Sequence, residues 1–341
     1  MSDFASRLIA WQKSHGRHDL PWQNTRDPYR IWISEIMLQQ TQVATVIPYY
    51  QRFMTHFPSI ASLASADEEA VLTHWSGLGY YARARNLHAA ARQIVARHQG
   101  VFPASVEAIT ALPGIGPSTA AAIAAFAFGV RGAILDGNVK RVLTRCFGIE
   151  GFPGDKAVEA KLWTLAESLL PEAEIERYTQ GLMDLGATLC TRAQPRCGDC
   201  PLSAQCVARR DDRIAQLPAP KRKKTIPERQ TVMLILRRGN EVLLEKRPAQ
   251  GVWGGLWSFP EVAPEAVLNS HLQTRFGVQA ARVAAMSPLV HTFTHFRLTI
   301  RVLVVWVNKP GAAAGAMWLD RFDAHGAALP TPVRRLLDLL D

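Results

Sequence analysis

The segment CTRAQPRCGDCPLSAQC, residues 190–206, contains four of the five cysteines of this 341-residue chain. The spacing C-x6-C-x2-C-x5-C places these four thiols at Cys190, Cys197, Cys200 and Cys206. Four thiols within one short segment indicate four thiolate ligands of a single centre, either an iron–sulfur cluster or zinc. The remaining Cys146 is interpreted as a small buried apolar residue.

The spacing of the cysteines favours an iron–sulfur cluster over zinc. Zinc sites usually contain two close cysteine pairs, whereas only Cys197 and Cys200 are that close here. The longer gaps favour [4Fe–4S]. A disulfide framework is the weaker alternative, because the N-terminus MSDFASRLIAWQKSHG lacks the long apolar core of a secretory signal. We therefore expect a cytoplasmic protein without a signal peptide.

The charge balance also points to a polyanionic partner. The net charge is +10, which favours nucleic acid over a merely solvated basic surface. The longest uncharged run, residues 108–130, is interrupted by prolines and glycines. It therefore predicts two elements separated by a turn and no membrane span.

The pattern of apolar residues divides the chain into two regions. Residues 3–208 have helical periodicity, and residues 229–341 predict an α+β domain with strands at 231–236, 242–244 and 296–307 and a helix at 265–276. Between them, residues 211–228 include the proline-rich and basic run LPAPKRKK at 217–224, which predicts an exposed linker. The basic run is either a solvated tether or a phosphate contact.

The segment LPGIGPSTA, residues 112–120, predicts a tight turn that leads into a helix. Gly114 and Gly116 allow the backbone to approach a ligand closely, and free N–H groups at the helix start can bind phosphate. The segment resembles the helix-hairpin-helix motif of DNA repair enzymes. A helix-capping turn without a ligand is the alternative.

Two carboxylates are candidates for acid–base or electrostatic catalysis. Glu35 is a lone acid in a mostly apolar helix, and burial would raise its pKa enough for general-acid catalysis near neutral pH. Asp136, in LDGNVKRV at 135–142, precedes a predicted helix. An isolated aspartate there is usually only a cap, but this one lies between the hairpin and the cysteine segment. A solvent-facing glutamate is the alternative for Glu35.

Two further segments predict contacts with DNA. The polar cluster QQTQ at 39–42 offers hydrogen-bond groups for base edges, and GLGYYARARNL at 77–87 interleaves aromatic rings that can enter a base stack with arginines that can hold phosphates. Packing of the tyrosines at a helix start is the alternative. The predicted DNA-contacting residues of these segments and the hairpin are Gln39, Gln40, Thr41, Tyr80, Tyr81, Arg83, Gly114, Gly116 and Ser118.

Together, the cysteine segment, the hairpin, LDGNVKRV, SEIMLQQTQV and GLGYYARARNLH closely resemble the endonuclease III superfamily. Within it they resemble the MutY-type adenine DNA glycosylases, over nearly the whole chain. The resemblance implies a helix-hairpin-helix glycosylase region at 1–210, with a six-helix barrel at about 28–130 and an iron–sulfur domain formed by about 1–27 and 131–210. It implies a linker at 211–228 and a Nudix-like recognition domain at 229–341.

The resemblance also assigns catalytic roles. Protonated Glu35 would donate to N7 of adenine, Asp136 would stabilise the resulting cation electrostatically or covalently, and Asn138 would orient the acid or the water. Trp22 would form part of the wall of the adenine pocket. Gln40 and Tyr80 would occupy or flank the gap that the flipped base leaves. The expected partner is duplex DNA bound by a monomer.

Two departures refine the implied activity. Relatives that cut the DNA backbone carry a lysine at the position of Ser118, and a hydroxyl cannot form their Schiff base. The region 272–278, LQTRFGV, lacks the glutamates that hold magnesium in Nudix hydrolases. The C-terminal domain is therefore expected to read 8-oxoguanine, with Phe293, Thr294 and His295 in place of the family's Phe-Ser-His loop.

The predicted function is excision of adenine mispaired with 8-oxoguanine or guanine, without strong lyase activity. The alternatives are an endonuclease III-like glycosylase and lyase acting on oxidised pyrimidines, and a non-enzymatic lesion-binding protein. A Nudix nucleotide hydrolase is a further, weaker alternative.

Overall fold

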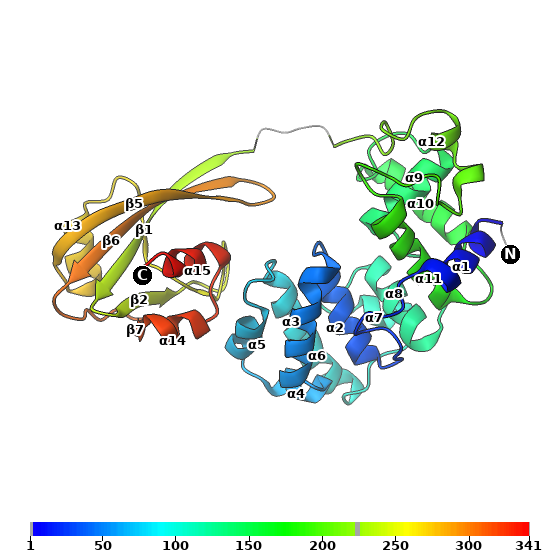
Figure 1. The fold of residues 1–341 in the computed structure, drawn as a ribbon. Helices are drawn as coiled ribbons and strands as arrows, with labels where there is room; N and C mark the ends of the chain where they lie inside the picture. The colour runs from blue at the N-terminus through cyan, green and yellow to red at the C-terminus, as the bar shows by residue number, and fades with distance from the viewer. Residues whose placement is uncertain (1–2, 222–225, 341) are drawn as a thin grey trace. The chain divides into compact units, whose positions relative to one another are not determined.

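The computed structural model describes residues 3–221 and 226–340 and divides into two compact units (Figure 1). Unit 1 comprises residues 1–65 and 86–223, and unit 2 comprises residues 66–85 and 224–341. No helix in the described part of the chain has the length and apolar character that a membrane crossing requires.

Unit 1 is helical, as the periodicity predicts. Its first half contains the helices that lead to and form the hairpin: α2 (Pro28–Leu38), α3 (Val43–His56), α4 (Ile60–Ser65), α7 (Val106–Thr110) and α8 (Pro117–Phe128). Helix α6 (Ala82–His98) begins in the segment that belongs to unit 2 and continues in unit 1. Helix α2 packs against both α3 and α8, which brings the polar end of α2 to the hairpin helix.

The second half of unit 1 surrounds the cysteine segment. It consists of α1 (Asp3–His15), α9 (Gly137–Phe147), α10 (Lys156–Ser168), α11 (Ile175–Asp184), a π-helical segment (Leu185–Leu189), a 3₁₀ turn (Ser203–Gln205) and α12 (Val207–Arg210). Helices α1 and α11 pack together, and one hydrophobic core joins α1, α8, α9 and α11 to the cysteine segment. Burial of this shared core fixes the cysteine segment relative to the helix that follows Asp136.

The hairpin has the predicted form, since α7 and α8 pack against each other across the glycine turn. Gly114 has a φ of +77°, and a Cβ atom there would lie 2.6 Å from the Cβ of Asn86. Both the left-handed backbone and the close approach of Asn86 therefore require glycine. Gly116 is the N-cap of α8, which Pro117 starts.

Unit 2 contains a seven-stranded mixed sheet. Five of its strands follow the order β3-β2-β1-β6-β5, while β4 pairs with β1 and β7 pairs with β2. The long strands β1 (Glu228–Arg238), β5 (Ala280–Thr292) and β6 (Arg297–Val307) form its centre and one edge, and β1 runs parallel to β6. The shorter strands are β2 (Glu241–Lys246), β3 (Trp257–Ser258), β4 (Glu261–Val262) and β7 (Ala316–Asp320). Helices α13 (Leu268–Phe276), α14 (Arg321–Gly326) and α15 (Thr331–Asp338) complete it.

Three boundaries differ from those predicted. The helix expected at 265–276 starts at Leu268. The segment 211–217 is exposed only in part, because Leu217 is buried in the core of unit 1 and Ile214 packs against it. The basic run extends into residues 222–225, which lie outside the described part of the chain.

The third difference concerns residues 66–85, which contain α5 (Glu68–Trp75) and group with unit 2 instead of unit 1. The predicted barrel at about 28–130 included them. Their side chains are held by hydrogen bonds to the C-terminal part of the chain, for example from Trp257 to Glu69. Local sequence patterns carry no information about such long-range contacts.

Candidate active site

Glu35 lies on α2 and borders the larger cavity of unit 1. Its neighbours Ser34 and Ile36 are buried, and Glu35 itself is partly exposed to the cavity. Removal from bulk water raises the pKa of the Glu35 carboxyl to about 8, with a further contribution from the negative charge of Asp136. A carboxyl with this pKa is protonated at neutral pH and can act as a general acid.

Asp136 caps α9, as its position before the helix predicts. Its Oδ1 accepts from the backbone N–H of Val139 at 2.8 Å. Burial raises the pKa of Asp136, while the N–H groups of Val139 and Asn138 and the charges of Arg141 and Lys140 act in the opposite direction. The two carboxyls are electrostatically coupled, because the charge of Asp136 contributes to the raised pKa of Glu35. Two coupled carboxyls in different environments are an arrangement that can divide acid and charge-stabilising roles between them.

Arg141 fixes the side chain of Asn138. Its Nη2 donates to Asn138 Oδ1 at 2.8 Å and to the Gly186 carbonyl at 2.7 Å, and its Nε donates to the Cys190 carbonyl at 2.7 Å. Gly186 lies in the π-helical segment, where a Cβ atom would come within 2.6 Å of the Asn138 Cβ. Arg141, which also binds the carbonyls of Gly186 and Cys190, therefore holds the Asn138 side chain in one orientation.

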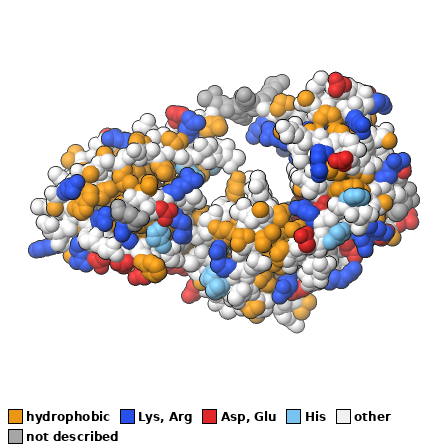
Figure 2. Space-filling view, in the orientation of Figure 1, with side chains coloured by type: hydrophobic (Ala, Val, Ile, Leu, Met, Phe, Trp, Pro, Cys, Tyr) orange, Lys and Arg blue, Asp and Glu red, His pale blue; other side chains and the backbone are white. Residues whose placement is uncertain are grey.

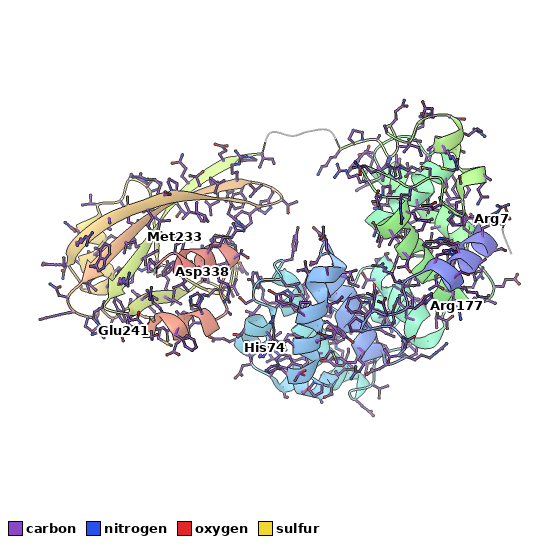
Figure 3. All side chains as sticks on the ribbon, in the orientation of Figure 1. Arg7, His74, Arg177, Met233, Glu241 and Asp338 are labelled. Carbon is purple, nitrogen blue, oxygen red and sulfur yellow. The ribbon has the colours of Figure 1, made fainter. Side chains whose placement is uncertain are left out.

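The cavity beside Glu35 has a volume of about 610 Å³, which exceeds that of a purine base. Trp22 and Ile31 contribute apolar surface, while polar groups come from both the 16–27 loop and α11. Figure 3 labels Arg177, one of the α11 residues that line it. The lining thus combines an apolar wall, hydrogen-bond groups and the protonatable Glu35.

The loop that carries Trp22 is fastened to α11. Arg17 forms an ion pair with Asp184, with Nη2 at 2.7 Å from Oδ1, and its backbone N–H donates to Oδ2 at 2.9 Å. Gln23 Nε2 donates to the Arg17 carbonyl at 3.0 Å. Trp22 packs edge-to-face against Tyr50 with ring centroids 5.4 Å apart. These contacts hold Trp22 as a fixed wall of the cavity.

The predicted DNA-contacting residues of unit 1 lie at the end of α2 and at the hairpin. Gln39 Nε2 donates to Thr119 Oγ1 at 3.3 Å, which joins the two segments. Gln40 is exposed and has a φ of +57°, an uncommon conformation for a residue with a side chain. Ser118 Oγ accepts from the Leu135 N–H at 2.9 Å, so its hydroxyl supports the loop immediately before Asp136.

The two tyrosines of the segment at 77–87 differ in their exposure to solvent. Tyr80 is 48% exposed with a φ of +51°, and the Arg83 guanidinium lies 5.2 Å from its ring centroid. Tyr81 is 8% exposed, and its hydroxyl donates to the Leu329 carbonyl at 2.9 Å. Buried packing and a hydrogen bond within unit 2 occupy the ring and hydroxyl of Tyr81, which favours the alternative of packing at a helix start over a direct DNA contact.

The four cysteines of the 190–206 segment line one cavity together with Cys146. The described residues contain no group of three or more His, Cys, Asp or Glu side chains arranged to hold a single metal ion. Arg145 is 3% exposed; it donates to the carbonyls of Leu217 and Thr191 at 2.8 and 2.7 Å and lies 3.5 Å from Cys190 Sγ. The positive charge of a buried guanidinium beside thiols can offset the negative charge of thiolate ligands.

The predicted recognition loop joins β5 to β6. Phe293 stacks on Phe296 with ring centroids 4.4 Å apart and lies 5.5 Å from the ring of Trp253. Thr294 and His295 are exposed at the tip. The loop therefore has a packed aromatic base with a hydroxyl and an imidazole presented to solvent.

A glycine hairpin, a glutamate with a raised pKa at a cavity and a capping aspartate are the features to compare with known proteins. Residues 33–168 match the helix-hairpin-helix GPD superfamily of base excision DNA repair proteins, and residues 231–339 match the NUDIX domain. A solved thermostable thymine-DNA glycosylase is 31% identical, with a TM-score of 0.55 over 61% of this chain and 95% of its own. An endonuclease III–DNA complex, 21% identical with a TM-score of 0.52, shares the fold.

The full-length relatives narrow the class. The "Adenine DNA glycosylase" of Buchnera aphidicola subsp. Baizongia pistaciae (strain Bp) is 37% identical, with 98% of this chain and 95% of the relative covered. The Homo sapiens "Adenine DNA glycosylase" is 34% identical, with 98% of this chain and 73% of the relative covered. The chain belongs to the adenine DNA glycosylase family.

Several residues of the site had no signal in the sequence. Arg17 and Asp184 are 167 positions apart and neither stands in a recognisable motif. Arg141 lies within LDGNVKRV, but only the fold reveals that its guanidinium contacts Asn138, Gly186 and Cys190.

Proposed function

We propose that this chain excises adenine mispaired with 8-oxoguanine or guanine in duplex DNA. The observation that carries the proposal is Glu35, whose pKa is raised to about 8 at a cavity large enough for a purine and electrostatically coupled to Asp136. A neutral carboxyl can protonate a base, and a nearby carboxylate can stabilise the sugar cation that forms. A protein that only binds lesions requires neither group.

The proposed reaction begins when adenine leaves the base stack and enters the cavity, at a cost of roughly a few kcal/mol. Glu35 donates its proton to N7, and the C1′–N9 bond breaks, with its electron pair leaving on the base. Asp136 stabilises the oxocarbenium-like sugar from its cap position. The ionised Glu35 then takes a proton from water, which adds to C1′, and Asn138 orients this water or the acid.

The same proposal gives the cysteine segment a supporting role. Cys190, Cys197, Cys200 and Cys206 would hold a [4Fe–4S] cluster, since they line one cavity and the long gaps in their spacing suit a cluster better than one ion. Arg145 would offset the negative charge of the thiolates. When bound, the cluster would order the loop that presents basic side chains to phosphates and would not react with the base.

The C-terminal unit is proposed to read the opposite base. Phe293, Thr294 and His295 would contact 8-oxoguanine, with the stacked Phe293–Phe296 pair as a rigid support. Helix α13 contains no aspartate or glutamate, so it offers no charged ligands for magnesium. Nucleotide hydrolysis by this unit is therefore not expected.

The test is single-turnover cleavage of a labelled duplex that contains one A:8-oxoguanine pair, analysed with and without hot alkali. Strand breaks that appear only after alkali support base removal without lyase action, as expected from Ser118. Breaks without alkali indicate a lyase. Tight binding without product under either condition contradicts the proposal and indicates a lesion-binding protein.

A further inference from the structure

We infer that Ser76, Tyr81 and Arg334 form a clamp on the Leu329 carbonyl that positions Tyr80 and couples it to the recognition loop at 293–295. The inference rests on the proposed function and on the family resemblance, which implies that Tyr80 occupies or flanks the gap that the flipped adenine leaves. It makes Ser76 and Tyr81 positioning residues that determine discrimination of the opposite base, although neither is exposed to DNA. All of these residues belong to unit 2.

The clamp centres on one backbone carbonyl. Leu329 is fully buried, and its carbonyl oxygen accepts from Ser76 Oγ at 2.9 Å and from Tyr81 OH at 2.9 Å. The Ser76 hydroxyl in turn accepts from Arg334 Nη2 at 3.0 Å, and the Tyr81 hydroxyl accepts from the Gly77 N–H at 3.3 Å. A buried network in which each group has a partner holds its members in one arrangement, because any displacement leaves a desolvated polar group.

The clamp lies on both sides of the segment that presents Tyr80. Between Ser76 and Tyr81, the φ angles of Gly77, Gly79 and Tyr80 are +98°, +78° and +51°. The left-handed conformation of Tyr80 is unfavourable for a residue with a side chain, so surrounding contacts must maintain it. The clamp supplies the contacts that Leu329 and Arg334 make with Ser76 and Tyr81.

The remaining contacts aim the exposed ring itself. Trp75 Nε1 and Arg83 Nη2 both donate to the Gly79 carbonyl, at 3.1 and 3.3 Å. The Arg83 guanidinium also lies 5.5 Å from the Trp75 ring centroid and 5.2 Å from that of Tyr80. Tyr80 therefore rests on a cation held by a buried indole, and the backbone beneath it is fixed at both ends.

A second path leads from this segment to the recognition loop. Arg85 Nη1 donates to the Gly254 carbonyl at 2.6 Å, and the preceding Trp253 packs against Phe293 with ring centroids 5.5 Å apart. Glu69 on α5 accepts from Trp257 Nε1 at 2.6 Å and pairs with Lys246 Nζ at 2.7 Å. Arg85, Gly254 and Trp253 thus form a continuous series of contacts from the tyrosine segment to Phe293, and this series is the route by which we infer that the two are coupled.

The experiment uses the full chain with Tyr81→Phe, which removes one hydroxyl and keeps the ring. Ser76→Ala and Ser76→Thr form a second pair, in which only threonine retains the hydroxyl. Tyr49→Phe is the matched control, since Tyr49 lies on α3 of unit 1. Two quantities are measured: hydrogen exchange of residues 76–85, and the ratio of single-turnover excision rates on A:8-oxoguanine and A:G duplexes.

We expect Tyr81→Phe and Ser76→Ala to accelerate exchange at 77–81 and to lower the rate ratio by about tenfold, which corresponds to about 1.4 kcal/mol. Ser76→Thr and Tyr49→Phe should match the wild type in both measurements. In a Phe293→Ala background, Tyr81→Phe should lower the ratio no further, because the coupled group is already lost.

Three results would overturn the inference. Unchanged exchange in Tyr81→Phe would show that the hydroxyl does not hold the segment. Faster exchange with an unchanged rate ratio, or effects of Tyr81→Phe and Phe293→Ala that simply add, would reduce the clamp to a stabilising contact. A wild-type chain that removes no adenine refutes the proposed function instead, and the exchange data then still decide whether the clamp exists.

Discussion

At the scale of single residues, Glu35 carries the proposed chemistry. Glu35→Gln removes the acidic proton with little change in volume, and we expect the excision rate to fall by about 10²–10⁴-fold while DNA affinity remains. Glu150→Gln is the control, because Glu150 is exposed and pairs with Arg213. Single-turnover kinetics and equilibrium binding separate the two effects. A variant that retains the wild-type rate would contradict the assignment.

The raised pKa of Glu35 predicts a pH dependence with a defined sign. The excision rate should decline as pH rises through about 8, because the acid form of Glu35 is lost, and Glu35→Gln should lack this decline. Stability should follow the same direction. Between the ordinary value of 4.5 and about 8, the folded chain retains a proton that the unfolded chain has released, so the free energy of unfolding falls as pH rises.

Thermal unfolding measures this second effect. The stability of Glu35→Gln relative to the wild type should increase from pH 5 to pH 8, since the amide has no proton to lose. A constant difference across this range would mean that Glu35 is ionised in the folded protein and is not available as an acid.

Asp136 permits a test that separates its charge from its capping role. Asparagine caps helices as well as aspartate does, so Asp136→Asn should retain the fold and the hydrogen bond to Val139. Loss of the charge should still lower the excision rate by at least about 10²-fold. Asp155→Asn, at the exposed N-cap of α10, is the matched control and should be active. Equal rates for the two variants would restrict Asp136 to capping.

The residues that the sequence predicts well are those whose environment is local. Asp136 precedes a helix start, and it caps that helix; Glu35 lies in an apolar run, and its pKa is raised by burial. Tyr80 and Tyr81 have nearly the same local pattern, yet one is exposed and the other is buried. The difference arises from Leu329, which is 248 positions away from Tyr81, and no local pattern encodes it.

At the scale of elements, the basic side chains in and beside the cysteine segment differ in whether they can bind phosphates. Figure 2 shows Lys and Arg side chains spread over the visible face of both units, so charge alone does not select them. Arg210 is paired with Asp211 at 2.7 Å, whereas Arg192 is exposed in the loop between two of the cysteines. The intramolecular partner reduces the charge that Arg210 can offer to DNA.

We therefore expect Arg192→Gln to weaken binding and Arg210→Gln to change it little. Each phosphate contact contributes about −0.9 to the slope of log affinity against log salt concentration. The slope for Arg192→Gln should thus be less negative by about that amount, on matched and mismatched duplexes alike. A salt titration that gives the same slope for Arg192→Gln and the wild type would remove Arg192 from the phosphate contacts.

The helical elements were predictable in kind because 3.6-residue periodicity and glycine or proline breaks mark them. The π-helical segment Leu185–Leu189 was not, and the close approach of Gly186 to Asn138 within it is a long-range contact that periodicity does not record. The sheet was predicted only in part. None of the residues of strand β5 is fully buried, and its alternation of half-buried and exposed residues is interrupted where the register shifts between Met286 and Leu289, so the pattern that identifies a strand is weak.

At the scale of the whole molecule, the sequence pattern divides the chain once, at the linker. The contacts between residues divide it at two further places, before residue 66 and after residue 85. Residues 66–85 belong to unit 2 although residues on both sides of them belong to unit 1. The two groupings have different origins. Periodicity records the type of local structure, and α5 is a helix in either grouping; membership of a unit depends on partners such as Lys246, Trp257 and Leu329.

This second division predicts the effect of truncation. A chain that ends at Lys221 loses the acceptors and donors that hold Glu69, Ser76 and Tyr81. We expect amide hydrogen exchange in residues 66–85 to accelerate strongly in the truncated chain, while α9, which packs in the core of unit 1, retains its protection. Exchange resolved by peptide compares both segments in one sample. Equal protection of residues 66–85 in the two chains would assign them to unit 1, and acceleration in both segments would mean that unit 1 does not fold without unit 2.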